Sequence, residues 1–217
     1  MRQTAMPLPA GTRPKPSLAG RTARVSTKAI WIALLLAAGA AAGSAAETRE
    51  PDVVVYFHHG SESAAIIGSA EARAQRMLAS VGISVAWRLG TADYHGRAEV
   101  IEAVLTERAA KDFRPGSLAC ATLGVQAGIR IEILHNRVRA AGPPAAVPSM
   151  LAHVLVHEIT HVLEAVSRHS ESGVMKAHWD TDDFRNMRGP LPFAAEDVSL
   201  IHAWSERHNR TLLAEAH

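Results

Sequence analysis

The sequence contains a single cysteine, Cys120, among 217 residues, so it cannot form an intramolecular disulfide. It also lacks acidic residues before Glu47, although six lysine and arginine side chains lie in that stretch. There are no internal repeats and no linker that would separate two domains. A chain of this length accommodates one ordinary domain, whose stability must come from an apolar core rather than from cross-links.

The acid-free stretch has the three parts of a secretory signal. Basic residues come first, the apolar run "AIWIALLLAAGAAAG" at 29–43 follows, and Ser44 and Ala46 supply small residues before Glu47. The run is shorter than the roughly 20 residues that a membrane-spanning helix needs. We therefore predict a signal peptide over 1–46, a domain over 47–217, and a periplasmic or secreted protein. An uncleaved N-terminal membrane anchor is the alternative.

Removal of the signal changes the charge of the chain. Seventeen of the 23 basic residues and all 21 acidic residues lie from Glu47 onward, which leaves a formal charge of −4. The sequence pI of about 9.0 therefore belongs mostly to the signal. The remaining domain has no basic excess that would predict a nucleic-acid partner, and we expect no stable membrane span after cleavage.

The pattern of the remaining chain predicts a mixed sheet with helices, that is, an α+β fold. β-Branched runs at 51–60 and 83–90 flank the helical pattern of 61–82, which predicts two parallel strands and a crossover helix. Further strands are expected at 98–106, in "LACATLG" and in "GIRIEILHNRVR". The last alternates apolar and polar residues, which we interpret as a strand near the sheet edge. A long helix follows, with Ser149 as its expected N-cap.

That helix carries "HEITH", in which His157 and His161 are four residues apart. At 3.6 residues per turn the two rings are separated by about 40° around the axis and about 6 Å along it, so both can reach one ion. Glu158 lies to one side, where it could contact a water on that ion. This H-E-x-x-H pattern is typical of two zinc ligands and a general base.

A catalytic zinc needs a third protein ligand, and three residues are candidates. Glu164 lies one turn beyond His161 on the same helix, and Glu196 could arrive from a second helix. His169 would be about 12 Å beyond His161 on a straight helix. It can bind only if the helix ends soon after His161 and the chain folds back, which the polar segment "SRHSESG" permits.

The segment "HEITHVLEAVSRHSESGVM" resembles the metzincin clan of zinc peptidases, with His169 at the third-ligand position and Met175 at the Met-turn. The later "LPFAAEDVSLIHAW" is similar to the clan's closing helix. The third histidine comes two residues later than in the clan, and Glu164 replaces its glycine. More closely, the sequence resembles a group of exported bacterial proteins with the same spacing and a tryptophan four residues after the methionine.

The resemblance implies a zincin-like metalloprotease domain, with an active-site helix and a C-terminal helix against a twisted sheet. It implies Zn²⁺ held by His157, His161 and His169, and hydrolysis of peptide or protein substrates by a metal-activated water with Glu158 as general base. The strand in "IRIEILHNRV" would be the edge that pairs with an extended substrate.

Two alternatives remain at this point. The protein could be a non-catalytic, zinc-stabilised binding protein of the cell envelope, or a thermolysin-like peptidase with Glu196 as third ligand. Among the other histidines, we expect His153 to be packed in the structure and His178 to lie on the surface.

Overall fold

The structure is a computed structural model that describes residues 50–94, 96, 98–108, 116–124 and 128–215. Residues 45–217 group into one compact unit. The predicted signal segment, 1–46, lies outside the described residues, as does any question of its cleavage.

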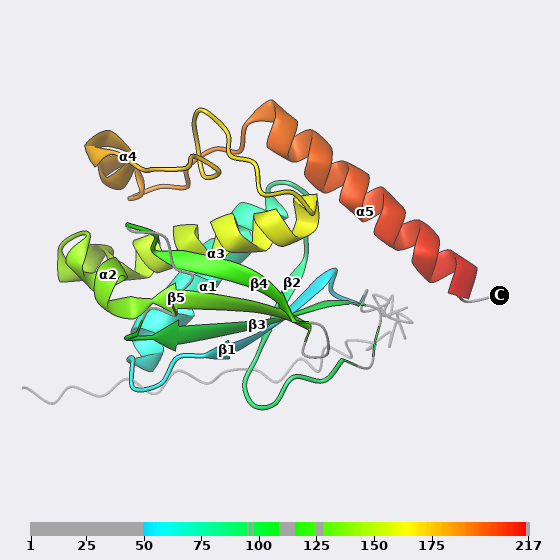
Figure 1. Cartoon of the computed structure of the whole chain (residues 1–217), viewed down its shortest axis with the longest axis horizontal. Coiled ribbons are helices and arrows are strands. Elements are labelled where there is room, and N and C mark those ends of the chain that lie inside the picture. Colours follow the sequence, from blue (N-terminus) through cyan, green and yellow to red (C-terminus); the bar gives the residue numbers. More distant parts are fainter. Residues whose placement is uncertain (1–49, 95, 97, 109–115, 125–127, 216–217) are drawn as a thin grey trace, which may run out of the picture. The chain divides into compact units, whose positions relative to one another are not determined.

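The fold is mixed α+β with a five-stranded mixed sheet, as the sequence predicted at this level (Figure 1). Its elements in chain order are β1 (Val53–His58), α1 (Ala64–Ala79), β2 (Val85–Arg88), β3 (Glu99–Thr106), β4 (Ala119–Gly124), β5 (Gly128–Leu134), α2 (His135–Ala140), the 3₁₀ turn η1 (Pro144–Ala146), α3 (Val147–Glu164), α4 (Thr181–Asn186) and α5 (Ala195–Glu215).

The strand order is β2-β1-β3-β5-β4. The strands β2, β1, β3 and β5 run parallel, and β4 runs antiparallel to β5. The predicted strand–helix–strand unit is present, with Val53 of β1 paired to Val85 of β2. The segment at 98–106, expected to be a strand, forms β3.

The prediction that residues 128–134 form the sheet edge is wrong. Strand β5 lies between β3 and β4, and β4 is the edge strand. The polar residues of β5 do not mark an edge. Arg130 lies 3.6 Å from Glu102 of β3 and 3.1 Å from Glu132, so these side chains pair across the less buried face of the sheet. Alternation reports a half-exposed face, which an interior strand can have as well as an edge strand.

The other face of the sheet is covered by α1 and α3 (Figure 1). Alternate residues of β1 and β5 are buried, and they pack with the apolar side of α3. Within the described residues, Pro144–Glu164 is the one helical stretch long and apolar enough to cross a membrane, but 78% of its most apolar 18-residue window is buried inside the fold. It is therefore accounted for as the core helix of the domain, and it positions the histidines beside the sheet.

The start of α3 differs from the prediction that Ser149 caps it. The N-cap is Ala146, and the first turn contains Pro148, whose missing N–H is not needed there. Ser149 is buried within the first turn of the helix, and its hydroxyl donates to the carbonyl oxygen of Met187. The Pro-rich connection before the helix thus starts it earlier than a polar cap would.

The end of α3 is set by Ala165, the only non-glycine residue with positive φ in the described part of the chain. Its φ of 55° and ψ of 27° are left-handed, and its N–H bonds to the carbonyl of Val162. This conformation costs an L-residue with a Cβ about 1–2 kcal/mol. The helix therefore stops three residues after His161, and the chain reverses.

Replacing Ala165 with glycine should stabilise the protein by about 0.5–1 kcal/mol, because glycine adopts positive φ without the Cβ penalty. The midpoint of urea denaturation measures this. The matched control is Ala141→Gly at the end of α2, where φ is −77°. There the same change should destabilise the protein by up to about 1 kcal/mol. Equal effects at the two positions would contradict our account of the helix end.

Candidate metal centre

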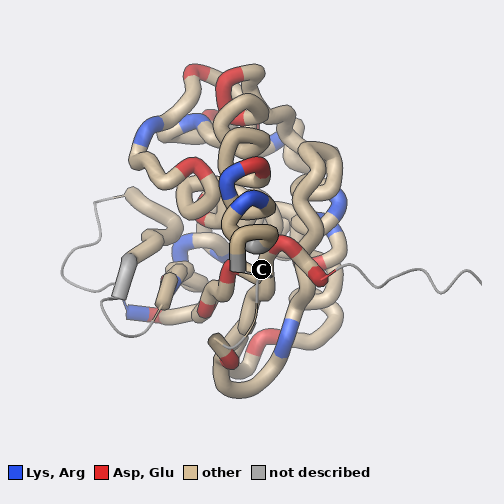
Figure 2. Tube along the Cα trace, turned by 90° about the vertical axis from the view of Figure 1, so that its right-hand side faces the viewer, with Lys and Arg blue, Asp and Glu red and all other residues tan. Residues whose placement is uncertain are grey.

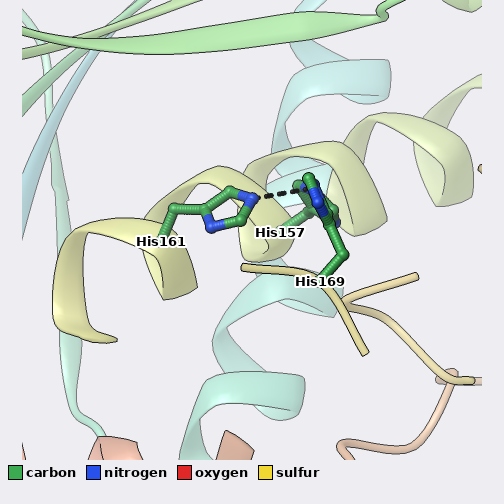
Figure 3. Close-up of side chains that lie close together, drawn as sticks. All are labelled: His157, His161 and His169. Carbon is green, nitrogen blue, oxygen red and sulfur yellow. Dashed lines mark hydrogen bonds between the residues drawn. The ribbon is translucent and has the colours of Figure 1, made fainter. Parts of the chain in front are cut away.

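Three histidines converge at the end of α3. His157 and His161 come from the helix, and His169 comes from the segment that folds back after Ala165 (Figure 3). One ring nitrogen from each lies within 4.8 Å of the other two. His157 is the most buried of the three and His169 the most exposed. The predicted ligands His157, His161 and His169 are therefore brought together.

Backbone carbonyls fix the orientation of the two helical rings. The Nδ1 of His157 lies 2.9 Å from the Val174 oxygen, and the Nδ1 of His161 lies 3.2 Å from the Val166 oxygen. A carbonyl only accepts, so each Nδ1 carries the proton and each Nε2 keeps its lone pair. Histidines that bind a metal through one ring nitrogen usually donate the other ring N–H to a carbonyl or carboxylate in this way, which fixes the ring orientation.

The two Nε2 atoms are 3.1 Å apart. With both Nδ1 atoms protonated and the rings neutral, this contact joins two acceptors, which repel unless a cation lies nearby. Burial lowers the pKa of His157 to about 4, although its carbonyl partner acts in the opposite direction. Burial also lowers the pKa of His161. A shared proton is thus disfavoured, and the arrangement fits a bound metal ion.

Glu158 is buried beside this cluster, on the same helix. Burial raises the pKa of its carboxyl to about 7, and a hydrogen bond from the backbone N–H of Ala121 on β4 acts against that rise. The contact places the Glu158 carboxyl between α3 and the edge strand β4. A carboxyl with a pKa near neutrality can both accept and return a proton.

Met175 lies in the turn that follows His169 and is completely buried. Its carbonyl accepts a hydrogen bond from Ser170 at 2.9 Å, which closes the loop around the third histidine. Gly173 has a φ of 78°, and a Cβ there would collide with the carbonyl oxygen of Pro192. The turn therefore needs glycine, and it also supplies the Val174 carbonyl that orients His157.

The loop that carries His169 is tied to the start of α5. Asp197 is fully buried and accepts from Arg168 Nη2 at 2.5 Å, from the Ser170 hydroxyl at 2.6 Å and from the Ala194 N–H at 2.9 Å. Two of these donors are the neighbours of His169 in sequence. The buried carboxylate thus fixes the backbone on both sides of the third histidine. Sequence reasoning did not identify this network.

The other two candidate ligands, Glu164 and Glu196, are not members of the histidine cluster. Burial raises the pKa of Glu164 to about 7, although Arg168 favours the charged form. The Glu164 and Glu196 carboxylates lie 3.7 and 3.4 Å from Arg168, and the Glu196 side chain is 70% exposed. Both glutamates therefore surround the arginine rather than the three imidazoles.

One aromatic side chain lines the cluster, and a further histidine packs against it. Trp179 packs edge-on against His157 and His153, with ring centroids 5.6 and 6.3 Å apart. His153 is buried and fully bonded, since its Nδ1 lies 2.7 Å from the Ser149 oxygen and its Nε2 accepts from Leu191 N–H. His178, in contrast, is exposed, as expected. In the sequence, only the spacing of Trp179, four residues after Met175, indicated that this side chain belongs to the site.

No protein-family model and no curated protein matches this chain. The donor set itself is informative, because neutral imidazoles are ligands for zinc, copper, iron and nickel. Three of them whose nitrogens lie this close together can hold one divalent transition-metal ion.

His169→Ala should weaken metal binding by at least about 100-fold, because even outer partners of such ligands contribute 10–100-fold. Metal content after dialysis against a graded chelator series measures the loss. Glu196→Ala and His178→Ala are the controls and should retain the ion. If Glu196→Ala lost the metal while His169→Ala retained it, the histidine cluster would not be the binding site.

Arg168→Ala should weaken metal binding about tenfold, because it releases the loop on one side of His169. The visible spectrum of a cobalt-loaded sample should change as well, since the third ligand would be less well held. Arg168→Lys should restore part of the affinity. The control is Arg185→Ala, which removes an exposed pair with Asp182 in α4 and should change neither property. An unchanged cobalt spectrum in Arg168→Ala would contradict the positioning role.

Proposed function

We propose that this protein is an exported zinc-dependent endopeptidase that hydrolyses peptide bonds in peptide or protein substrates. One observation carries the proposal. Three histidine nitrogens converge at the end of α3, two of them on rings whose tautomers are fixed by backbone carbonyls, and the buried Glu158 is the neighbour of His157 in the same helix turn.

The residues divide between binding and proton transfer. His157, His161 and His169 would hold Zn²⁺, which when bound supplies a Lewis acid for the scissile carbonyl and lowers the pKa of water toward 7. Glu158 takes a proton from the attacking water on its carboxylate and delivers it to the leaving amine. Its pKa near 7 suits both steps, and the Ala121 N–H holds the carboxylate in place.

The substrate would bind along β4. This strand is at the sheet edge, and Ala121, in its middle, donates to Glu158. An extended peptide that adds to a free strand edge forms backbone hydrogen bonds independently of its side chains. The β4 edge therefore takes the role that the sequence assigned to residues 128–134, and it would align a peptide bond beside Glu158.

The zincin-like, metzincin-type assignment draws on several features together. These are the helix that carries H-E-x-x-H, the buried Met175 in the turn after the third histidine, and the long C-terminal helix α5 tied to that turn through Asp197. Export rests on the sequence of residues 1–46 alone. Zinc is the metal we propose because three imidazoles are a ligand set of catalytic zinc sites, and a glutamate general base beside the ligands is typical of the H-E-x-x-H pattern.

Glu158→Gln should retain bound zinc but lower the hydrolysis of a quenched fluorogenic peptide library by at least about 100-fold, because the amide cannot accept the proton. Metal analysis of the same sample provides the comparison. A chelator should abolish wild-type turnover, and added zinc should restore it.

Two results would count against this proposal. Zinc-dependent hydrolysis that persists in Glu158→Gln would show that Glu158 is not the general base. A zinc-loaded wild-type protein that cleaves no library member would favour the non-catalytic binding protein instead.

A further inference from the structure

A hollow lies between α1, the first half of α3 and the connection after α4, away from the three clustered histidines. Its volume is about 200 Å³. The lining residues are Arg73, Arg76, Met77, Ser80, Ser149, His153, Arg188, Gly189 and Pro190. Nothing in the proposed peptidase mechanism uses this hollow.

Hydrogen bonds hold its walls together. The Ser149 hydroxyl donates to the carbonyl of Met187, and Leu191 N–H donates to His153 Nε2 at 3.1 Å. The guanidinium of Arg73 donates to the carbonyl of Arg188 at 3.4 Å. The connection after α4 is therefore bonded to α3 on both sides of Arg188 and to α1 at Arg188 itself. Such a hollow keeps its shape before any ligand arrives.

The charge in this hollow is of one sign. Three of its lining residues are arginines and none is acidic. Within the part of the chain that the structure describes, Arg73, Arg76 and Arg188 form no ion pair, whereas Arg130, Arg168 and Arg185 each pair with a carboxylate. Like charges gathered around one concavity repel, and this cluster belongs to a domain whose formal charge is negative.

His153, which also lines the hollow, lies within the field of these arginines. Burial lowers the pKa of His153, and the charge of Arg73 lowers it further. Both of its ring nitrogens are already bonded. The guanidinium groups, rather than the imidazole, are thus the donors that remain for a ligand. Each offers a planar fork that matches two oxygens of an oxyanion.

We propose that this hollow binds a phosphate-type oxyanion through Arg73, Arg76 and Arg188. The ligand could be a free phosphate or the phosphate headgroup of an anionic lipid, because both present the same oxygens. The site does not depend on the metal centre or on the proposed peptidase activity.

The test is a calorimetric titration of the purified protein with inorganic phosphate at constant ionic strength, with chloride as the replaced ion. We expect one site, and a melting temperature that rises with phosphate. The double variant Arg76→Gln/Arg188→Gln should bind about 100-fold more weakly, that is, tenfold for each charged hydrogen-bonding partner removed. Arg73 is left intact because it also bonds to the wall.

The matched control is Arg88→Gln, an exposed arginine on β2 that lies outside the hollow, which should bind phosphate as the wild type does. Vesicles of phosphatidylglycerol, compared with phosphatidylcholine, distinguish the two sources. Vesicle binding that free phosphate displaces and the double variant loses would identify a lipid headgroup, and binding of free phosphate alone would identify a soluble ligand. The proposal is overturned if the wild type binds neither, or if the double variant and Arg88→Gln bind alike.

Discussion

The contact between the Nε2 atoms of His157 and His161 is the constraint on which the candidate site depends. Two neutral imidazoles 3.1 Å apart present lone pairs to each other, and neither ring can turn away without losing its bond to a backbone carbonyl. The helix alone brings the rings to one face, but it does not choose their tautomers. The carbonyls of Val166 and Val174 do so, and both belong to the chain beyond the helix. The site is therefore created by the turns after α3.

These turns occur at defined positions. Ala165 takes the left-handed conformation that ends the helix, and Gly173 allows the second turn to approach Pro192. Between them, Asp197 holds Arg168 and Ser170 from α5. A buried carboxylate is stable only when its oxygens are bonded, and each bond it makes here also restrains the loop that carries His169. In the side view of Figure 2, both basic and acidic residues are present along the chain trace. The hydrogen bonds that the buried Asp197 carboxylate requires thus also fix the position of His169, the third candidate ligand.

Much of the fold could be predicted because its signals are local. The alternation of β1, the crossover helix and the four-residue spacing of His157 and His161 each fall within a short window of sequence. The edge strand was missed because alternation reports which face is buried, not which neighbour is present. The helix start was missed because Pro148 competes with Ser149 for the first turn. The bonds of Asp197 to Arg168 and of Ser149 to Met187 span 29 and 38 residues, and no local pattern encodes them.

A cation held by the three histidines would also be coupled to Glu158 through charge. Without a cation, burial holds the pKa of Glu158 near 7, so its carboxyl is only partly ionised at neutral pH. A cation among the three imidazoles would favour the ionised form, as opposite charges within a few ångströms do. By reciprocity, the ionised carboxylate would strengthen cation binding by the same free energy. Acidification should therefore reduce both the ionised fraction of Glu158 and the affinity for a cation, since it protonates Glu158 and then the histidines. A cation bound among the three imidazoles would thus relieve the lone-pair repulsion and also favour the ionised form of Glu158.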